Sequence, residues 1–155
     1  MIRRAKNTDI DRLNELLYQV QKLHAEGRPD IFKLGEKKYT TEELRAFIED
    51  DMTPIFVYEN EGVVLGYAFC IYQLTEENHQ LYRRKVLYID DLCVDKASRR
   101  QGVGKKLYHY VLQTAADNGC DSVTLNVWNV NPDAQRFYES MGMTPLKTTM
   151  EQQLS

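Results

Sequence analysis

The sequence predicts a single mixed α/β domain of 155 residues, and three observations support that prediction. Short apolar segments of strand type alternate with longer segments in which apolar residues recur every three or four positions. Within residues 85–107, a strand-like segment leads into a glycine-containing turn and then into a helix-like segment. No repeat, low-complexity tract or Pro/Gly-rich linker divides the chain, so we expect one core.

The first part of the chain is expected to form a strand and two helices. Residues 2–5 predict a short strand, and Thr8 is expected to cap the helix that follows. The apolar residues of that helix recur at intervals of three and four: Ile10, Leu13, Leu17 and Val20. After a linking segment over residues 27–35, a second capped helix is predicted from about Thr41.

The rest of the chain predicts five strands and two helices. Residues 54–58 and 63–72 predict a hairpin, and the polar residues 73–84 predict a second turn before a strand that ends at Val94. The remaining expected elements are a helix over about 102–118, a strand over 122–128, a helix after Asn131 and a last strand over about 143–152. The predicted order is therefore β-α-α-β-β-β-α-β-α-β.

A glycine-containing turn opens the helix predicted at 102–118. Gly102 and Gly104 remove side chains where the backbone must turn and come close to a ligand. Unpaired N–H groups and the positive end of the helix dipole point to the same place. The surrounding cations are Arg99, Arg100, Lys105 and Lys106. This arrangement predicts a receptor for a pyrophosphate, although an ordinary turn with solvated cations is the alternative.

The spacing of this turn excludes two common phosphate-binding motifs. A dinucleotide fold has a third glycine where this chain has Leu107, and the P-loop spacing is absent. Arg99, Gly102 and Gly104 instead fit the pattern Gln/Arg-x-x-Gly-x-Gly/Ala. In this the segment resembles the pyrophosphate-binding motif of the GNAT superfamily, the acetyl-CoA-dependent N-acetyltransferases.

A second segment, residues 129–143, resembles the GNAT pattern Asn-x-x-Ala-x-x-Phe-Tyr-x-x-x-Gly-Phe, with Met143 in the final aromatic place. Asn131 is a good N-cap, Pro132 suits the first helical position and Gly142 can end the helix. One face of the helix is predicted to hold Ala134, Phe137, Tyr138 and Met141. The alternative is a short core helix whose tyrosine only packs.

The resemblance covers residues 54–150 and implies a GNAT fold, in which a mixed, splayed sheet carries helices on both faces. It implies that the backbone of Leu92, Cys93 and Val94 pairs with the pantetheine arm of acetyl-CoA, the co-substrate. The other residues it implies for binding are Arg99, Arg100, Gln101, Gly102, Val103, Gly104, Lys105, Asn131, Ala134 and Tyr138. Tyr138 is also implied as the general acid that protonates the CoA thiolate.

Two adjacent carboxylates, Asp90 and Asp91, interrupt the apolar strand before the turn. Neighbouring strand residues point to opposite faces, so we expect at least one of them to face the cleft. The segment is most similar to spermidine/spermine-type small-amine acetyltransferases, in which Tyr-x-Glu-Asp-x-x-Val occupies this place. Either aspartate could accept the proton of the acceptor amine and hold its cation. The alternative is that they pair with a neighbouring cation such as Arg84.

Other nucleophiles and bases are weaker candidates. His79 lies in a polar turn, His24 ends the first helix and can touch substrate, and His109 is expected at the surface. Cys93 invites a covalent acyl-enzyme mechanism, but no histidine is adjacent in the sequence to activate it. The resemblance uses only the backbone of this cysteine, so direct attack in a ternary complex is expected.

Composition limits the remaining possibilities. A net charge of −3 argues against general nucleic-acid binding, and no long apolar span or signal peptide is expected. Three cysteines without metal spacing predict free thiols, no metal site and a cytoplasmic protein, which we expect to be a homodimer. A protein N-terminal or lysine acetyltransferase and a non-catalytic acetyl-CoA sensor are the alternatives to a small-amine acetyltransferase.

Overall fold

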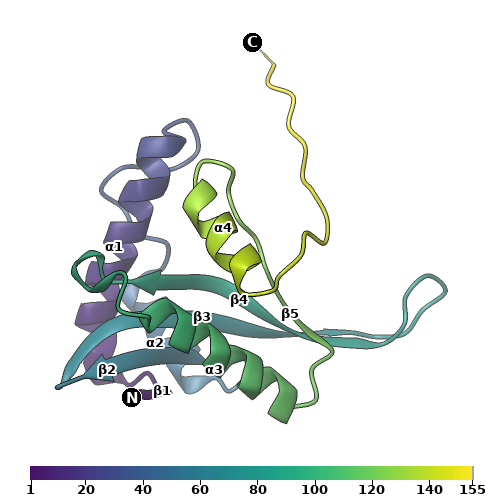
Figure 1. The fold of residues 1–155 in the computed structure, drawn as a ribbon, viewed down its shortest axis with the longest axis horizontal. Coiled ribbons are helices and arrows are strands. Elements are labelled where there is room, and N and C mark those ends of the chain that lie inside the picture. Colours follow the sequence, from purple (N-terminus) through teal and green to yellow (C-terminus); the bar gives the residue numbers. More distant parts are fainter. Residues whose placement is uncertain (155) are drawn as a thin grey trace.

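A computed structural model describes residues 1–154 of the chain and shows a mixed sheet with helices on both faces (Figure 1). The longer elements are β1 (Ile2–Arg4), α1 (Ile10–Gly27), α2 (Thr41–Glu49), β2 (Ile55–Asn60), β3 (Val63–Thr75), β4 (Arg84–Val94), α3 (Val103–Asp117), β5 (Ser122–Leu125) and α4 (Pro132–Ser140). Two short 3-10 turns, η1 (Asn7–Asp9) and η2 (Lys96–Ser98), precede α1 and α3. The predicted α/β class is confirmed.

The strands lie in the order β1-β2-β3-β4-β5. Neighbours are antiparallel except β4 and β5, which are parallel. The long β3–β4 hairpin projects from the body of the molecule (Figure 1). None of the helices within residues 1–154 is both long and apolar enough to cross a membrane.

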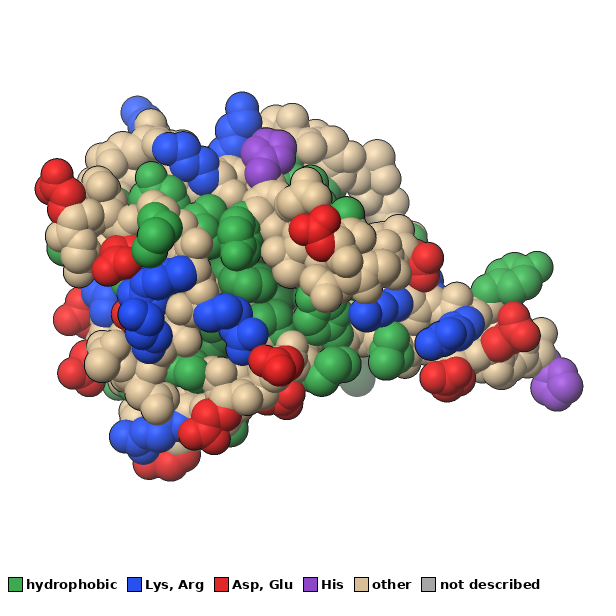
Figure 2. Space-filling model, turned by 90° about the horizontal axis from the view of Figure 1, so that it is seen from below, with side chains coloured by type: hydrophobic (Ala, Val, Ile, Leu, Met, Phe, Trp, Pro, Cys, Tyr) green, Lys and Arg blue, Asp and Glu red, His purple; other side chains and the backbone are tan. Residues whose placement is uncertain are grey.

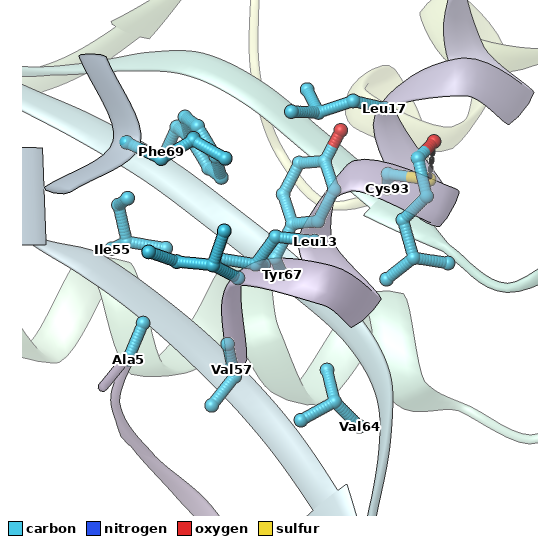
Figure 3. Packing of buried hydrophobic residues seen from close by; sticks show 12 residues of the cluster. Ala5, Leu13, Leu17, Ile55, Val57, Val64, Tyr67, Phe69 and Cys93 are labelled. Atoms are coloured by element: carbon cyan, nitrogen blue, oxygen red, sulfur yellow. Dashed lines mark hydrogen bonds between the residues drawn. The ribbon is translucent and has the colours of Figure 1, made fainter. Parts of the chain in front are cut away.

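The sheet separates two hydrophobic cores. On one face α1 and α2 cover Ile55, Val57, Tyr67, Phe69 and Cys93, and Figure 3 shows the ring of Tyr67 among these side chains. On the other face α3 and α4 cover the second core, whose strand residues include Phe56, Ala68, Cys70, Leu87, Ile89, Leu92 and Val94. The alternation of strand side chains therefore assigns each residue to one core or the other.

Most predicted helix signals are confirmed. The Thr40 hydroxyl accepts from the Glu43 N–H at 3.1 Å in a capping box, and Asn131 Oδ1 accepts from the Ala134 N–H at 3.3 Å. The prediction that Thr8 caps the first helix is wrong. Thr8 lies inside the turn η1, which is organised by Asp9, because its carboxylate accepts from the Lys6 N–H at 2.8 Å.

Two predicted strands differ from the structure. β5 ends at Leu125 instead of residue 128, and residues 143–152 do not form a strand. Neither segment pairs with any of the described strands, and a strand exists only where its backbone groups meet another strand. Residues 144–154 instead form an extended, exposed tail that leads away from the sheet (Figure 1).

Candidate functional site

The sheet opens beside the second half of β4. Its parallel pairing with β5 runs from Val86 opposite Ser122 to Ile89 opposite Leu125 and ends there, so no described strand adjoins residues 90–94 on that side. The Asp95 N–H donates to the Leu65 carbonyl of β3 at 2.8 Å. Since N–H groups alternate in direction along a strand, the N–H of Val94 faces the open edge. The predicted splay of the sheet is thus present.

The turn before α3 lies next to this open edge. Gly102 has φ 77°, a left-handed conformation, and a Cβ added there would meet no atom within 4 Å. Gln101 is exposed like the neighbouring cations, whereas the Val103 side chain is buried in the core, which leaves only its backbone available. The turn therefore offers backbone N–H groups and open space together.

Three of the four predicted cations are free to meet an anion. Arg99, Arg100 and Lys105 are exposed, and none forms a salt bridge with any residue in the described range. Lys106 is turned aside, with its Nζ 3.5 Å from the hydroxyl of Tyr58. Figure 2 shows Lys and Arg side chains at the end of the molecule opposite the projecting hairpin, where they alternate with Asp and Glu side chains.

α4 brings Tyr138 to the other flank of the gap. Phe137 lies close to α3, because a Cβ on Gly104 would be 3.6 Å from its ring, and the rings of Tyr138 and Tyr108 are 6.1 Å apart. Burial, followed by the charge of Asp91, raises the pKa of Tyr138 well above its usual value. Asn131 uses its side-chain oxygen to cap α4 at Ala134, so both residues fix the start of this helix.

A β-bulge changes the expected directions of the two acids. Phe69 and Cys70 are consecutive on β3 but pair with Asp91 and Ile89, so Asp90 is an extra residue on β4. The Tyr39 hydroxyl donates a hydrogen bond to Asp90, and the Tyr67 hydroxyl donates one to Asp91. Both tyrosines belong to the core under α1 and α2. The expectation that the acids point to opposite faces is therefore wrong: both side chains lie on the α1/α2 side.

The partners of the acids were not foreseen from the sequence. Asp90 accepts from the Tyr39 hydroxyl and forms a salt bridge to Lys38 Nζ at 3.2 Å. Arg84, the cation proposed as a partner, instead donates to Ser122 Oγ at 2.6 Å. Lys38 and Tyr39 come from the segment between the first two helices, and only the fold brings them to β4.

Asp91 is a hydrogen-bonded carboxylate with a raised pKa. The Tyr67 hydroxyl donates to its Oδ2 at 2.7 Å, and burial raises the pKa of its carboxyl to about 6, against the lowering effect of that hydrogen bond. The sequence did carry one sign of this contact. A tyrosine inside an apolar strand must find a partner for its hydroxyl once it is buried.

The remaining candidates from the sequence are Cys93 and the three histidines. Burial raises the pKa of the Cys93 thiol to about 12, and its Sγ faces the Leu16 carbonyl at 3.9 Å, so the covalent alternative has no support. His24 packs on Phe32, whereas His79 lies exposed between β3 and β4 and His109 is exposed on α3. No group of three potential metal ligands occurs among residues 1–154.

The sequence and the fold of the chain are similar to those of known proteins. The model of the acetyltransferase (GNAT) family matches residues 17–143, which include the open edge of β4, the start of α3 and α4. The chain is 28% identical to thialysine N-epsilon-acetyltransferase of Bos taurus over 151 residues, 94% of this chain and 85% of the relative. It is 30% identical to N-alpha-acetyltransferase 30 of Dictyostelium discoideum over 135 residues, 74% of this chain and 72% of the relative. A solved tetramutant of the BH1408 protein from Bacillus halodurans superimposes with a TM-score of 0.96 at 30% identity, covering 99% of both chains.

Proposed function

The chain belongs to the acetyltransferase (GNAT) family and is an acetyl-CoA-dependent N-acetyltransferase, and from that premise we propose that its acceptor is a small primary amine. The amine attacks the thioester directly in a ternary complex. One observation carries this proposal: two carboxylates lie on one face of β4 beside its open edge, and Tyr138 lies on the other face. The proposed base and the proposed acid then lie on opposite faces of the sheet, beside the open edge of β4.

The first step is deprotonation of the acceptor. An alkyl ammonium has a pKa of about 10.4, so it must lose a proton before its nitrogen can attack. Asp91, with its carboxyl pKa of about 6, is ionised at neutral pH and accepts that proton directly or through water. Asp90 holds the cation of the incoming amine, in competition with the ammonium of Lys38.

The later steps use the open edge and α4. Attack on the thioester builds an oxyanion, which the N–H of Val94 stabilises because it points to the open edge. Tyr138 then donates its proton to the departing thiolate. Its raised pKa keeps the phenol protonated over the working range, and it also makes the phenol a weak acid. We therefore expect a contribution at the lower end of the usual range for general acid catalysis.

The turn before α3 binds the pyrophosphate of acetyl-CoA through backbone N–H groups of residues 101–105, assisted by Arg99, Arg100 and Lys105. A Gly102→Val substitution fills the open space there and should abolish CoA binding, measured by calorimetry. Gly62 provides a matched control, because it has φ 79° in the β2–β3 turn and equally open surroundings. Gly62→Val carries the same backbone strain and should leave CoA affinity unchanged. Equal affinity in both variants and the parent would contradict this assignment.

The acceptor class is tested with a panel of diamines, amino acids and a peptide with a free N-terminus, with thiol release as the readout. Asp90→Asn should raise KM for a cationic amine and leave CoA affinity unchanged. Preference for the peptide would instead support a protein N-terminal or lysine acetyltransferase. CoA binding without thiol release for any acceptor would indicate a sensor. A cytoplasmic homodimer stays a prediction from the sequence.

A further inference from the structure

Three aromatic side chains from two separate segments meet at the end of α1. The ring centroids of His24 and Phe32 are 4.8 Å apart, and those of Phe32 and Trp128 are 5.0 Å apart in an edge-to-face contact. His24 lies in the last turn of α1 and Phe32 in the segment that follows it, whereas Trp128 belongs to the segment between β5 and α4. These three residues, the aromatic trio, therefore join two segments that are distant in the sequence.

The trio lies near the part of the open edge where the acceptor is proposed to bind. β5 separates from β4 after Leu125, so the segment that carries Trp128 borders the gap in the sheet. Burial, followed by the charge of Lys38, lowers the pKa of His24, which places Lys38 close to the trio. The same ammonium is 3.2 Å from the carboxylate of Asp90. Lys38 thus connects the trio to the acid that is proposed to hold the amine.

The two segments that carry the trio are fixed against each other. A Cβ added to Gly27 would be only 2.9 Å from the Cβ of Val130, so α1 and the segment before α4 pack without space for a further side chain. The end of α1 and the start of α4 lie side by side in Figure 1. Phe32 is half-buried, and the side chain of Trp128 stays 43% exposed. The trio therefore offers a firmly held aromatic surface to a ligand.

The charges around the trio favour an uncharged group at this surface. Lys38 lies near both the trio and Asp90, so a second ammonium on the acceptor would approach a like charge. The carboxylates of Asp30 and Glu151, at the same end of α1, are already paired with Arg28 at 2.8 and 3.2 Å. An apolar ring instead gains free energy when it leaves water and packs on exposed aromatic side chains.

We propose that Phe32 and Trp128 hold an aromatic ring of the acceptor, so that the preferred substrates are arylalkylamines, primary amines on a short alkyl chain that ends in a ring. The ring packs on these two side chains, and the alkyl chain leads from there to the amine beside Asp90 and Asp91. This inference rests on the proposed small-amine acetyltransferase and names the class of its acceptor. The contact with the ring is the same before and during the reaction, so its loss should change KM more than kcat.

The fluorescence of Trp128 tests binding without any turnover, because it is the only tryptophan of the chain. 2-Phenylethylamine is the probe. Butane-1,4-diamine is the matched comparison, because it carries a second ammonium in place of the ring. The phenyl compound should change the emission saturably and bind at least about 10-fold more tightly than the diamine.

Phe32→Ala removes one ring of the proposed site and leaves the fluorophore in place. It should weaken binding of 2-phenylethylamine and raise the KM of thiol release for that amine, each at least about 10-fold, and leave KM for the diamine unchanged. Unchanged CoA affinity, measured by calorimetry, shows that the variant is folded. Phe32→Leu, which keeps an apolar side chain, should lose part of the same binding. Tyr82→Ala is the control, because it removes a ring that is 87% exposed in the β3–β4 hairpin, and it should change none of these values.

The outcomes separate this inference from the proposed function. Equal or tighter binding of the diamine would overturn the inference, and so would an affinity for 2-phenylethylamine that Phe32→Ala leaves unchanged. Thiol release with the diamine, together with no fluorescence response to 2-phenylethylamine, would overturn the arylalkylamine class and leave the acetyltransferase intact. Saturable binding of 2-phenylethylamine that depends on Phe32, with no thiol release from any amine, would support the ring site and contradict the proposed function.

Discussion

The hydrogen bond from Tyr67 to Asp91 gives a quantitative test of the general base. Tyr67→Phe removes the hydroxyl that donates to Asp91 Oδ2 at 2.7 Å and keeps the ring in its place in the core. This bond favours the charged carboxylate, so its loss raises the pKa of Asp91. A hydrogen bond to a charged group contributes about 1.5–3 kcal/mol, and 1.36 kcal/mol corresponds to one pKa unit. The pKa of Asp91 should therefore rise from about 6 to between about 7 and 8.

The assay is kcat/KM as a function of pH, with one amine used for all variants so that titration of the amine cancels in the ratio. At pH 6 the variant should be about 5- to 50-fold slower than the parent, and the two should converge above about pH 9. Tyr39→Phe is the matched control, because it removes the equivalent donor from Asp90. A ratio that does not change with pH, or a pH-dependent loss in Tyr39→Phe alone, would refute Asp91 as the base.

Three further predictions concern the acid, the acceptor and stability. Tyr138→Phe should bind CoA normally and lower kcat by about 10²-fold, and an unchanged kcat would assign the proton to water. Lys38→Met removes the cation that competes for Asp90, so KM for a cationic amine should fall several-fold, whereas a rise would show that Lys38 assists binding. Asp9→Asn breaks the ion pair between Asp9 and Arg3. Because the Asp9 side chain is only 9% exposed, this substitution should lower the unfolding free energy by about 3 kcal/mol. Arg3 lowers the pKa of Asp9, so this stability is present at neutral pH and is lost as pH falls through the lowered pKa. Denaturant unfolding measures this loss of unfolding free energy. Asp51→Asn is the control: the Asp51 side chain is 96% exposed, so this substitution should change the unfolding free energy by less than about 1 kcal/mol.

The parts of the fold that depend on local signals could be predicted from the sequence. A cap is decided within one helical turn, which is why Thr40 and Asn131 begin their helices as expected. The turn at Gly102 could be predicted for the same reason, since a glycine marks locally where the backbone turns, and its φ of 77° agrees. These signals fix the turn before α3 and the start of α4, which are two of the borders of the site.

The remaining parts depend on residues that are distant in the sequence. The bulge at Asp90 exists only in the pairing between β3 and β4, so the sequence of β4 alone predicts regular alternation. The contacts of Lys38 and Tyr39 with Asp90 span more than fifty residues of chain. The missing last strand has the same origin, because residues 143–152 carry a strand pattern but pair with none of the described strands.

The bulge at Asp90 also makes β4 sensitive to its own length. Before the bulge, odd-numbered residues such as Leu87 and Ile89 enter the core under α3 and α4. After it, the parity is reversed: even-numbered Leu92 and Val94 enter that core. Removal of Asp90 alone would restore regular alternation and keep these four residues on one face, whereas a deletion elsewhere in β4 that leaves the bulge in place would turn part of the strand inside out. Homologues are therefore expected to vary in this strand by substitution, while insertions and deletions accumulate in the hairpin beyond it.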